Sequence, residues 1–239
     1  MIETAWRFGV RRLLFLGSSC IYPKFAKRPI REEALFTGAL EPTNQWYAIA
    51  KIAGIKMCEA LRQQHGFDAI RLMPTNLYGP GDSYHPTNSH VLPALIRRFH
   101  EAAEANLPSV TCWGTGSPLR EFLHVDDLGS ACVCALESWS SLALVDEQGN
   151  PLAYLNVGTA VDITIKELAE QIAKVVGFRG MIKWDTNKAD GTPKKQLEVS
   201  RMKNLGWTYS IPLYEGLAST YSHFCRQLSS KDPASFLRL

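Results

Sequence analysis

The chain has 239 residues, 46% of them apolar, and 26 lysines and arginines against 23 aspartates and glutamates give a formal net charge of +3. This length and composition support a buried core in one large or two modest domains, and the short apolar runs argue against a transmembrane helix. The near-neutral charge, with no run of basic residues, argues against nucleic acid or a membrane surface as partner and leaves anionic small molecules as candidates.

Helices and strands are expected to alternate along most of the chain. The expected helices cover residues 1–8, 45–64, 89–101, 125–137, 164–177, 200–205 and 212–228. The expected strands, of which the first two read as buried, cover residues 11–16, 68–73, 109–113, 153–157 and 181–184. Thr43 or Asn44 is the expected N-cap and Gly66 the C-cap of the second helix, and Thr164-x-x-Glu167 predicts a capping box.

This alternation predicts an α/β fold, with a Rossmann-like parallel sheet, crossover helices and a smaller α/β domain. Residues 22–44, rich in Pro, Lys and Arg, and residues 138–151 are expected to be loops. No G-x-G-x-x-G or similar Gly-rich turn occurs anywhere in the chain.

Tyr47 and Lys51 share one face of the second helix, one turn apart. A cation beside a phenol stabilises the phenolate, so we expect Lys51 to lower the pKa of Tyr47 and prepare it for proton transfer to a carbonyl oxygen. The spacing alone is weak evidence, because a chance match is common with eight tyrosines and an amphipathic surface helix explains it equally well. Ser18 and Cys20 favour the catalytic interpretation, because they follow the end of a strand, where open α/β sheets place their chemistry.

The six cysteines include no metal-type C-x-x-C pair and lie mostly in apolar segments. This pattern predicts reduced thiols in a cytoplasmic protein without a metal site, and the first residues lack the order of a signal peptide. Cys20 stands apart by its position at a strand end, while five are expected to fill the core: Cys58, Cys112, Cys132, Cys134 and Cys225.

Several segments carry a resemblance to a known family. They are Phe15 to Pro23, Pro42 to Asn44, Tyr47 to Lys56, Met73 to Pro80, Asn88 to Val91, Trp113-Gly114, Arg120 to Asp127, Asn156 to Thr159 and Asp190 to Lys194. In these segments the chain resembles the extended short-chain dehydrogenase/reductases that act on nucleotide sugars. Ser18-Ser19-Cys20 and Asn88-Ser89-His90 narrow the resemblance to the GDP-L-fucose synthase branch.

The resemblance implies epimerisation of GDP-4-keto-6-deoxy-D-mannose at C3 and C5, followed by reduction of the C4 ketone by NADPH. A ketone acidifies the hydrogens on both neighbouring carbons, so inversion needs one group to remove a proton and another to return one. The resemblance points to Cys20 as the base and His90 as the acid, since cations favour a thiolate and histidine titrates near neutral pH. Without the resemblance, His90 reads as a residue of the first helical turn bonded to backbone or solvent.

Further roles follow from the resemblance. Tyr47 protonates O4, Lys51 orients the nicotinamide ribose, and Ser18 hydrogen-bonds the substrate oxygen. The residues implied to contact NADP(H) are Leu16, Gly17, Ser18, Ser19, Lys51, Pro74, Thr75, Asn76, Leu77 and His90. The residues implied to hold the GDP-sugar, each of which also reads as a surface or core residue, are Arg98, Trp113, Arg120, Asp190 and Lys195.

The resemblance also implies a domain division. Residues 1–74 form a partial dinucleotide-binding domain, and residues 75–239 mainly a substrate-binding domain, with segments around 109–157 returning to the sheet. Because the family begins with a strand, a Gly-rich turn and a helix, we expect an N-terminally incomplete chain that binds NADPH poorly. The family commonly forms homodimers through the Tyr47 helix.

Two alternatives stay open at this point. One is a noncatalytic fragment that pairs with a complete subunit. The other is a related nucleotide-sugar 4-epimerase or dehydratase, against which the Cys20 and His90 pair argues.

Overall fold

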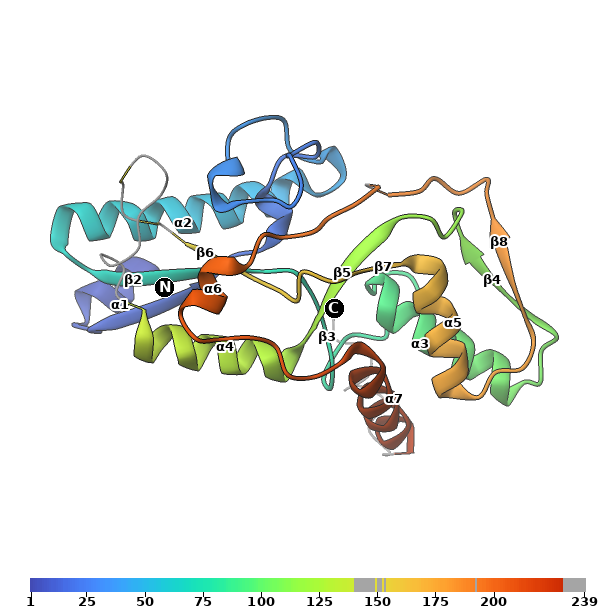
Figure 1. Cartoon of the computed structure of the whole chain (residues 1–239). Helices are drawn as coiled ribbons and strands as arrows, with labels where there is room; N and C mark the ends of the chain where they lie inside the picture. The colour runs from blue at the N-terminus through green and yellow to red at the C-terminus, as the bar shows by residue number, and fades with distance from the viewer. Residues whose placement is uncertain (140–148, 150–151, 153, 192, 230–239) are drawn as a thin grey trace. The chain divides into compact units, whose positions relative to one another are not determined.

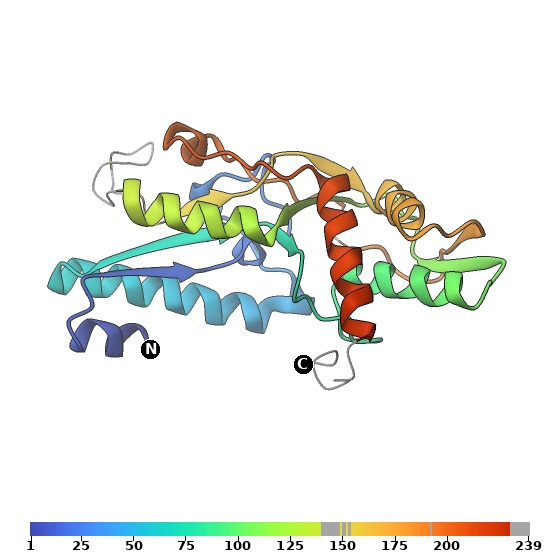
Figure 2. The ribbon, with the colours of Figure 1, turned by 90° about the horizontal axis from the view of Figure 1, so that it is seen from below.

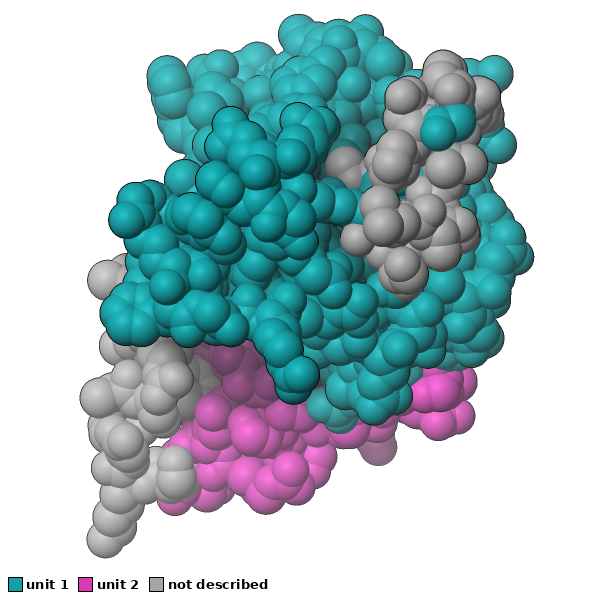
Figure 3. Space-filling model, turned by 90° about the vertical axis from the view of Figure 1, so that its left-hand side faces the viewer, with its two compact units in different colours: residues 1–76, 126–160, 195–209 teal, residues 77–125, 161–194, 210–239 magenta. Residues whose placement is uncertain are grey.

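The computed structural model describes residues 1–139, 149, 152, 154–191 and 193–229. The chain forms two compact units (Figure 3). Unit 1 takes in residues 1–76, 126–160 and 195–209, and unit 2 takes in residues 77–125, 161–194 and 210–239. Unit 1 therefore includes residues 195–209, which lie beyond the segments that the sequence assigned to the sheet. The roles of the two domains stay predictions.

Unit 1 is built on a parallel sheet with strand order β1-β2-β6, which confirms the predicted Rossmann-like class (Figure 1). Helices α2 and α4 lie on opposite faces of strands β1 and β2 (Figure 2). The regular elements, with η for short 3-10 turns, are α1 (Ile2–Arg7), β1 (Arg12–Leu16), η1 (Ser19–Ile21), η2 (Glu32–Ala34), η3 (Pro42–Asn44), α2 (Gln45–His65), β2 (Asp68–Pro74), α4 (Val125–Ser138), β6 (Leu155–Val157) and α6 (Ser200–Asn204).

Strand β2 is almost wholly buried, as predicted, whereas β1 is only half-buried. In the part of the chain that the structure describes, β1 pairs with β2 alone and so lies at an edge of the sheet. An edge strand keeps one side open to solvent, which explains its exposure. Residues 11–16 were predicted to form a buried strand; the strand is confirmed, but its predicted burial was wrong.

Helix α2 begins and ends close to the predicted residues. Gly66 is its C-cap, with φ 67° in the left-handed region that glycine adopts readily. Asn44 occupies the N-cap but its side chain makes no capping hydrogen bond, because the η3 turn enters the helix directly. The buried face of the helix consists of Ala48, Ile55, Cys58 and Leu61.

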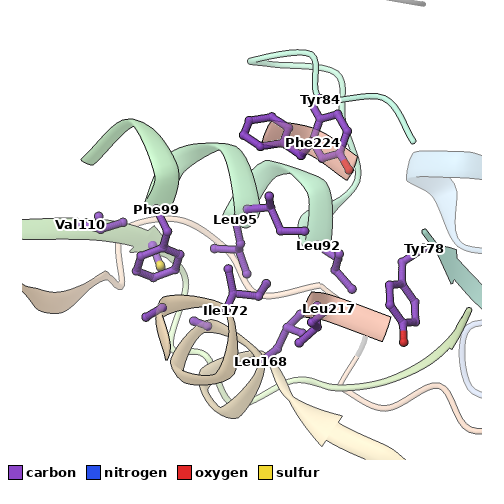
Figure 4. Packing of buried hydrophobic residues seen from close by; sticks show 14 of the residues in the cluster. Tyr78, Tyr84, Leu92, Leu95, Phe99, Val110, Leu168, Ile172, Leu217 and Phe224 are labelled. Carbon is purple, nitrogen blue, oxygen red and sulfur yellow. The ribbon is translucent and has the colours of Figure 1, made fainter. Parts of the chain in front are cut away.

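Unit 2 contains a sheet of order β3-β5-β7 and a parallel pair β4-β8. Its elements are β3 (Asn76–Tyr78), α3 (Val91–Glu104), β4 (Ser109–Trp113), β5 (Leu119–His124), β7 (Asp162–Thr164), α5 (Ile165–Val176), β8 (Met181–Asp185) and α7 (Leu213–Ser229). Side chains of α3, α5 and α7 form the core shown in Figure 4, including Leu92, Phe99, Leu168, Leu217 and Phe224.

The local signals in this unit were read correctly where they are strongest. The Thr164 side chain accepts from the Glu167 backbone and the Glu167 side chain accepts from the Thr164 backbone, which confirms the capping box. Strand β5 was missed, because Arg120 and Glu121 interrupt the apolar pattern of a strand. The expected strand start at residue 153 and most of the loop 138–151 lie outside the described residues.

Candidate active site

The end of strand β1 places a serine and a cysteine in one tight turn of unit 1. Gly17 is buried, and a Cβ at this position would lie 2.3 Å from the sulfur of Met73, so the backbone passes close to β2. Ser18 then caps the η1 turn, its Oγ accepting a 3.2 Å hydrogen bond from the backbone N–H of Cys20. The sheet thus fixes the direction in which Ser18 and Cys20 leave the strand.

Helix α2 brings Tyr47 and Lys51 to the same strand end. Tyr47 is hydrogen-bonded to Ser18 through their side chains. The ammonium of Lys51 donates a 2.9 Å hydrogen bond to the carbonyl oxygen of Leu16. Residues that are far apart in the chain therefore meet at one place, as the catalytic interpretation of Tyr47 and Lys51 requires.

The expected effect of Lys51 on Tyr47 is corrected by this geometry. Burial raises the pKa of Tyr47; the hydrogen bond with Ser18 lowers it and the neighbouring Cys20 raises it. The Lys51 ammonium lies 5.6 Å from the centre of the Tyr47 ring and is directed to the backbone at Leu16. The phenol is therefore stabilised as a protonated group, which suits a proton donor.

Cys20 faces a cation that the sequence alone had placed elsewhere. The ammonium of Lys195 donates a hydrogen bond of 3.2 Å to the Cys20 sulfur. All six cysteines lie among the described residues and are free. Of the five expected core cysteines, Cys58 and Cys112 are buried. The other three are only half-buried and are not among the buried residues of helices α4 and α7: Cys132, Cys134 and Cys225.

A buried polar network supports this turn, and its central residue, Asn156, was named from the sequence only within a resemblance segment and was given no role. Asn156 is fully buried in β6 and accepts a 2.6 Å hydrogen bond from the hydroxyl of Tyr22. Its amide nitrogen donates to the carbonyl oxygens of Ile30, at 2.9 Å, and Glu198, at 3.1 Å. The available signal was a polar residue inside the apolar run of a short strand.

The residues expected to line the cofactor, except Leu77 and His90 of unit 2, lie at or beside one edge of the sheet in unit 1. The Gly17 N–H donates a 2.8 Å hydrogen bond to the carbonyl of Leu72, and the Thr75 N–H donates at 3.0 Å to Val157, so three parallel strands end together. A hydroxyl and an ammonium, from Ser18 and Lys51, stand at this edge. This donor set fits the nicotinamide-ribose end of a dinucleotide.

His90 belongs to unit 2, where it is the N-cap of α3 rather than a residue of its first turn. Its side chain is exposed and makes no capping hydrogen bond. Burial raises the pKa of nearby Asp82, and the charge of His90 lowers it. The ring nitrogen Nδ1 of His85 accepts hydrogen bonds from the backbone of Thr87, at 3.2 Å, and Asn88, at 3.1 Å, and so shapes the loop before His90.

Two of the predicted substrate residues stack in unit 2. Trp113 is 63% exposed, which excludes the core reading of this residue. The guanidinium of Arg98 lies 5.5 Å from the centre of the Trp113 ring and donates to the Thr111 carbonyl at 3.0 Å. The ammonium of Lys188, which the sequence did not suggest, lies 5.6 Å from the same ring. An exposed indole can stack on a base, and the two cations beside it can neutralise a phosphate.

Asp190 and Arg120 also lie near each other in unit 2. Asp190 accepts hydrogen bonds from the backbone and hydroxyl of Thr115, at 2.9 and 2.7 Å. These hydrogen bonds lower the pKa of Asp190, and the charge of Arg120 lowers it further. Asp190 therefore braces the turn at Gly114 and Thr115, next to Trp113.

The structure thus distributes the expected site residues between the units. Ser18, Cys20, Tyr47, Lys51 and Lys195 lie together in unit 1. Unit 2 holds His90, Arg98, Trp113, Arg120 and Asp190. Among the described residues, no cluster of three or more histidines, cysteines or carboxylates could bind a metal ion, and no helix is long and apolar enough to cross a membrane.

Comparison with known proteins gives consistent matches. Residues 1–143 match the NAD dependent epimerase/dehydratase family. The chain is 57% identical over 231 residues to a putative GDP-L-fucose synthase 2 of Arabidopsis thaliana, covering 97% of this chain and 67% of the relative. It is 56% identical over 224 residues to the GDP-L-fucose synthase of Escherichia coli K12, covering 94% of this chain and 70% of the relative.

A solved structure extends these matches. The GDP-mannoheptose C4 reductase from Campylobacter jejuni, with NADP bound, superposes with a TM-score of 0.82 at 34% sequence identity. The match covers 94% of this chain and 71% of the reductase.

Proposed function

The chain belongs to the NAD dependent epimerase/dehydratase family and, within it, to the GDP-L-fucose synthases, and we propose on that basis that it makes GDP-L-fucose. The substrate is GDP-4-keto-6-deoxy-D-mannose, which is epimerised at C3 and C5 and then reduced at C4. The observation that carries the proposal is the meeting of Ser18, Cys20, Tyr47 and Lys51 at the end of β1. Simple ketone reduction needs the serine, tyrosine and lysine, and Cys20 adds a base for epimerisation.

In the reductive step, Tyr47 gives its proton to the C4 oxygen. Its phenol is protonated at neutral pH, since the ordinary tyrosine pKa is about 10 and partial burial raises that of Tyr47, and Ser18 hydrogen-bonds the hydroxyl. NADPH, when bound, supplies the hydride. Lys51 would hold the ribose end of the cofactor, with the segments 16–19 and 74–77 lining it and His90 near it.

In the epimerisation step, Cys20 removes a proton from a carbon beside the ketone, and His90 returns one on the opposite face. The His90 side chain is exposed and uncommitted to helix capping, which leaves it available as the acid.

The GDP portion is assigned to a second set of residues. Arg98, Arg120 and Lys195 neutralise the diphosphate, and the exposed ring of Trp113 stacks on the guanine. Asp190 accepts from a guanine or sugar donor. Its hydrogen bonds to Thr115 orient the carboxylate for this role.

We also propose a homodimer that forms through helix α2. An apolar stripe with helical spacing runs along its exposed side: Trp46, Ile49, Ala53 and Met57, of which Trp46 is 76% exposed. A second copy that presents the same stripe would cover both. Light scattering should show dissociation for Trp46→Glu, and no change for Met181→Glu, a 63% exposed methionine of unit 2. A monomeric unsubstituted chain would contradict the proposal.

A cytoplasmic location completes the proposal. All six cysteines are free, including Cys20, whose proposed role requires a reduced thiol.

The test uses the chain joined to the segment of the Escherichia coli relative that it does not cover, here called the joined protein. In the joined protein, Cys20→Ser should abolish epimerisation and spare hydride transfer to an already epimerised ketone. Cys132→Ser, in helix α4, serves as the matched control and should leave both steps unchanged. Equal loss of both steps in Cys20→Ser would contradict the assigned role of Cys20.

A further inference from the structure

The side chains of Lys195 and Cys20 meet although 175 positions separate them in the chain. The ammonium nitrogen lies 3.2 Å from the sulfur, and both side chains are half-buried. The preceding lysine, Lys194, has a different partner, because its ammonium pairs with Asp162 at 2.7 Å. Two adjacent lysines therefore have different partners.

The position of Cys20 is fixed by its own turn. Ser18 receives the Cys20 N–H at 3.2 Å, while Ser19 and Ile21 on either side are buried at 2% and 0% exposure. The sulfur therefore projects from a turn whose neighbours are anchored in the core.

The position of Lys195 is fixed by the segment that follows it. The N–H of Ile30 donates to the Gln196 carbonyl and the N–H of Glu198 donates to the Ile30 carbonyl, both at 2.8 Å. The Gln196 amide donates at 2.8 Å to the carbonyl of Ala160, and Leu197 is fully buried. The chain beside Lys195 is therefore held like a short strand.

Asn156 connects the two segments. It accepts from Tyr22, two residues after Cys20, and donates to Glu198, three residues after Lys195. A fully buried side chain with satisfied hydrogen bonds holds its partners in one arrangement. The contact between the ammonium and the sulfur is consequently set by the core, unlike a contact between two mobile surface side chains.

From this geometry we infer that Lys195 is the positioning residue that keeps the Cys20 sulfur in its charged, proton-accepting form. The inference rests on the proposed function and gives Lys195 a task beyond neutralising the diphosphate. The thiolate takes the proton from the substrate carbon, the electron pair of that C–H bond forms the C=C bond of an enolate, and the π pair of the C4 carbonyl moves to its oxygen. The ammonium keeps its protons beside the resulting neutral thiol, and His90 supplies the proton that re-forms the C–H bond on the other face.

The test measures the alkylation rate of Cys20 by iodoacetamide at neutral pH, followed peptide by peptide with mass spectrometry. Because the thiolate is the reactive form, Lys195→Met should slow alkylation about tenfold, whereas Lys195→Arg should stay near the unsubstituted rate. Lys194→Met removes the neighbouring cation and should leave the Cys20 rate unchanged. The half-buried Cys132 is the internal reference, and its rate should be the same in all variants.

An unchanged or faster Cys20 rate in Lys195→Met, with the Cys132 rate constant, would overturn the inference. If Lys195→Met does not fold, a second measurement tests the inference. It is the far-ultraviolet thiolate absorption at neutral pH of the unsubstituted chain, from which the absorption of Cys20→Ser is subtracted. A thiolate band supports the inference and its absence overturns it.

A kinetic arm in the joined protein separates this inference from the proposed function. If Lys195→Met raises KM for the GDP-sugar while the alkylation rate is unchanged, Lys195 binds the diphosphate only. The inference then fails and the proposed reaction stands. Epimerisation that survives in Cys20→Ser would instead overturn the proposed function, whatever the alkylation rates are.

Discussion

A methyl group on Gly54 would lie 2.3 Å from the ring of Phe15, so helix α2 packs against strand β1 where only glycine fits. Gly54 lies inside the helix that carries Tyr47 and Lys51, and Phe15 lies in the strand that leads to Ser18 and Cys20. This close approach contributes to the meeting of the proposed catalytic groups at the end of β1.

We expect Gly54→Ala to lower the free energy of unfolding by about 1–3 kcal/mol, because the added methyl forces the ring aside. The matched control is Gly129→Ala in helix α4, where a Cβ meets no atom within 4 Å. That change should stabilise the chain by up to about 1 kcal/mol through helix propensity. Urea denaturation measures both, and equal stabilisation by the two substitutions would contradict the packing argument.

The Arg201 guanidinium supports the loop that follows the cysteine turn. It donates hydrogen bonds to the carboxylates of Glu32, at 2.5 Å, and Glu33. The Glu32 side chain is only 2% exposed. Arg201→Met leaves a buried carboxylate without its cation and should cost about 3–5 kcal/mol at neutral pH. Arg7→Met, which removes an exposed pair with Glu3, should cost about 0–1 kcal/mol.

The pH dependence of this variant has a defined sign. Burial raises the pKa of Glu32, and the charge of Arg201 lowers it, so removing Arg201 raises it further. A carboxyl with a raised folded pKa adds stability at low pH and loses that contribution as pH rises through the folded value. The deficit of Arg201→Met should therefore shrink between neutral pH and pH about 5. A constant deficit in urea denaturation would contradict this assignment to Glu32.

Local signals in the sequence were sufficient for part of the fold. Gly66 and the Thr164–Glu167 capping box act within one helical turn, so their patterns predicted the helix ends correctly. Strand β5 was missed because Arg120 and Glu121 interrupt its apolar pattern, and the strand forms through its antiparallel pairing with β7.

The candidate site was predictable only in its residue types. Tyr47, Lys51, Ser18 and Cys20 could be selected because each follows a strand end or shares a helix face. The partner of Cys20, Lys195, could not be selected from the sequence, since it reaches Cys20 through tertiary contacts such as those of Asn156. The direction of the Tyr47 pKa shift was wrong for the same reason, because burial is a property of the folded chain.

Tyr47→Phe in the joined protein should reduce the rate of ketone reduction by about 100- to 10,000-fold while epimerisation continues. The ordinary tyrosine pKa is about 10 and partial burial raises that of Tyr47, so the unsubstituted phenol stays protonated through neutral pH and its ionisation should not limit reduction there. Tyr214→Phe, at an exposed position of α7, is the control and should leave reduction unchanged. A Tyr47→Phe protein that reduces the ketone at the normal rate would exclude Tyr47 as the proton donor.

The affinity for NADPH should differ between the chain and the joined protein. The 239 residues contain no Gly-rich turn to receive a pyrophosphate, so we expect weak NADPH binding by the chain and at least about tenfold tighter binding by the joined protein. Titration of NADPH fluorescence measures both proteins under the same conditions. Micromolar affinity of the unjoined chain would contradict this expectation.

The central claim is that Cys20 makes this family member an epimerase as well as a reductase. The most direct measurement incubates the joined protein with GDP-4-keto-6-deoxy-D-mannose in heavy water without NADPH and locates deuterium by NMR. Our account predicts deuterium at C3 and C5 with the unsubstituted protein and none with Cys20→Ser. Absence of deuterium at both carbons with the unsubstituted protein would contradict it.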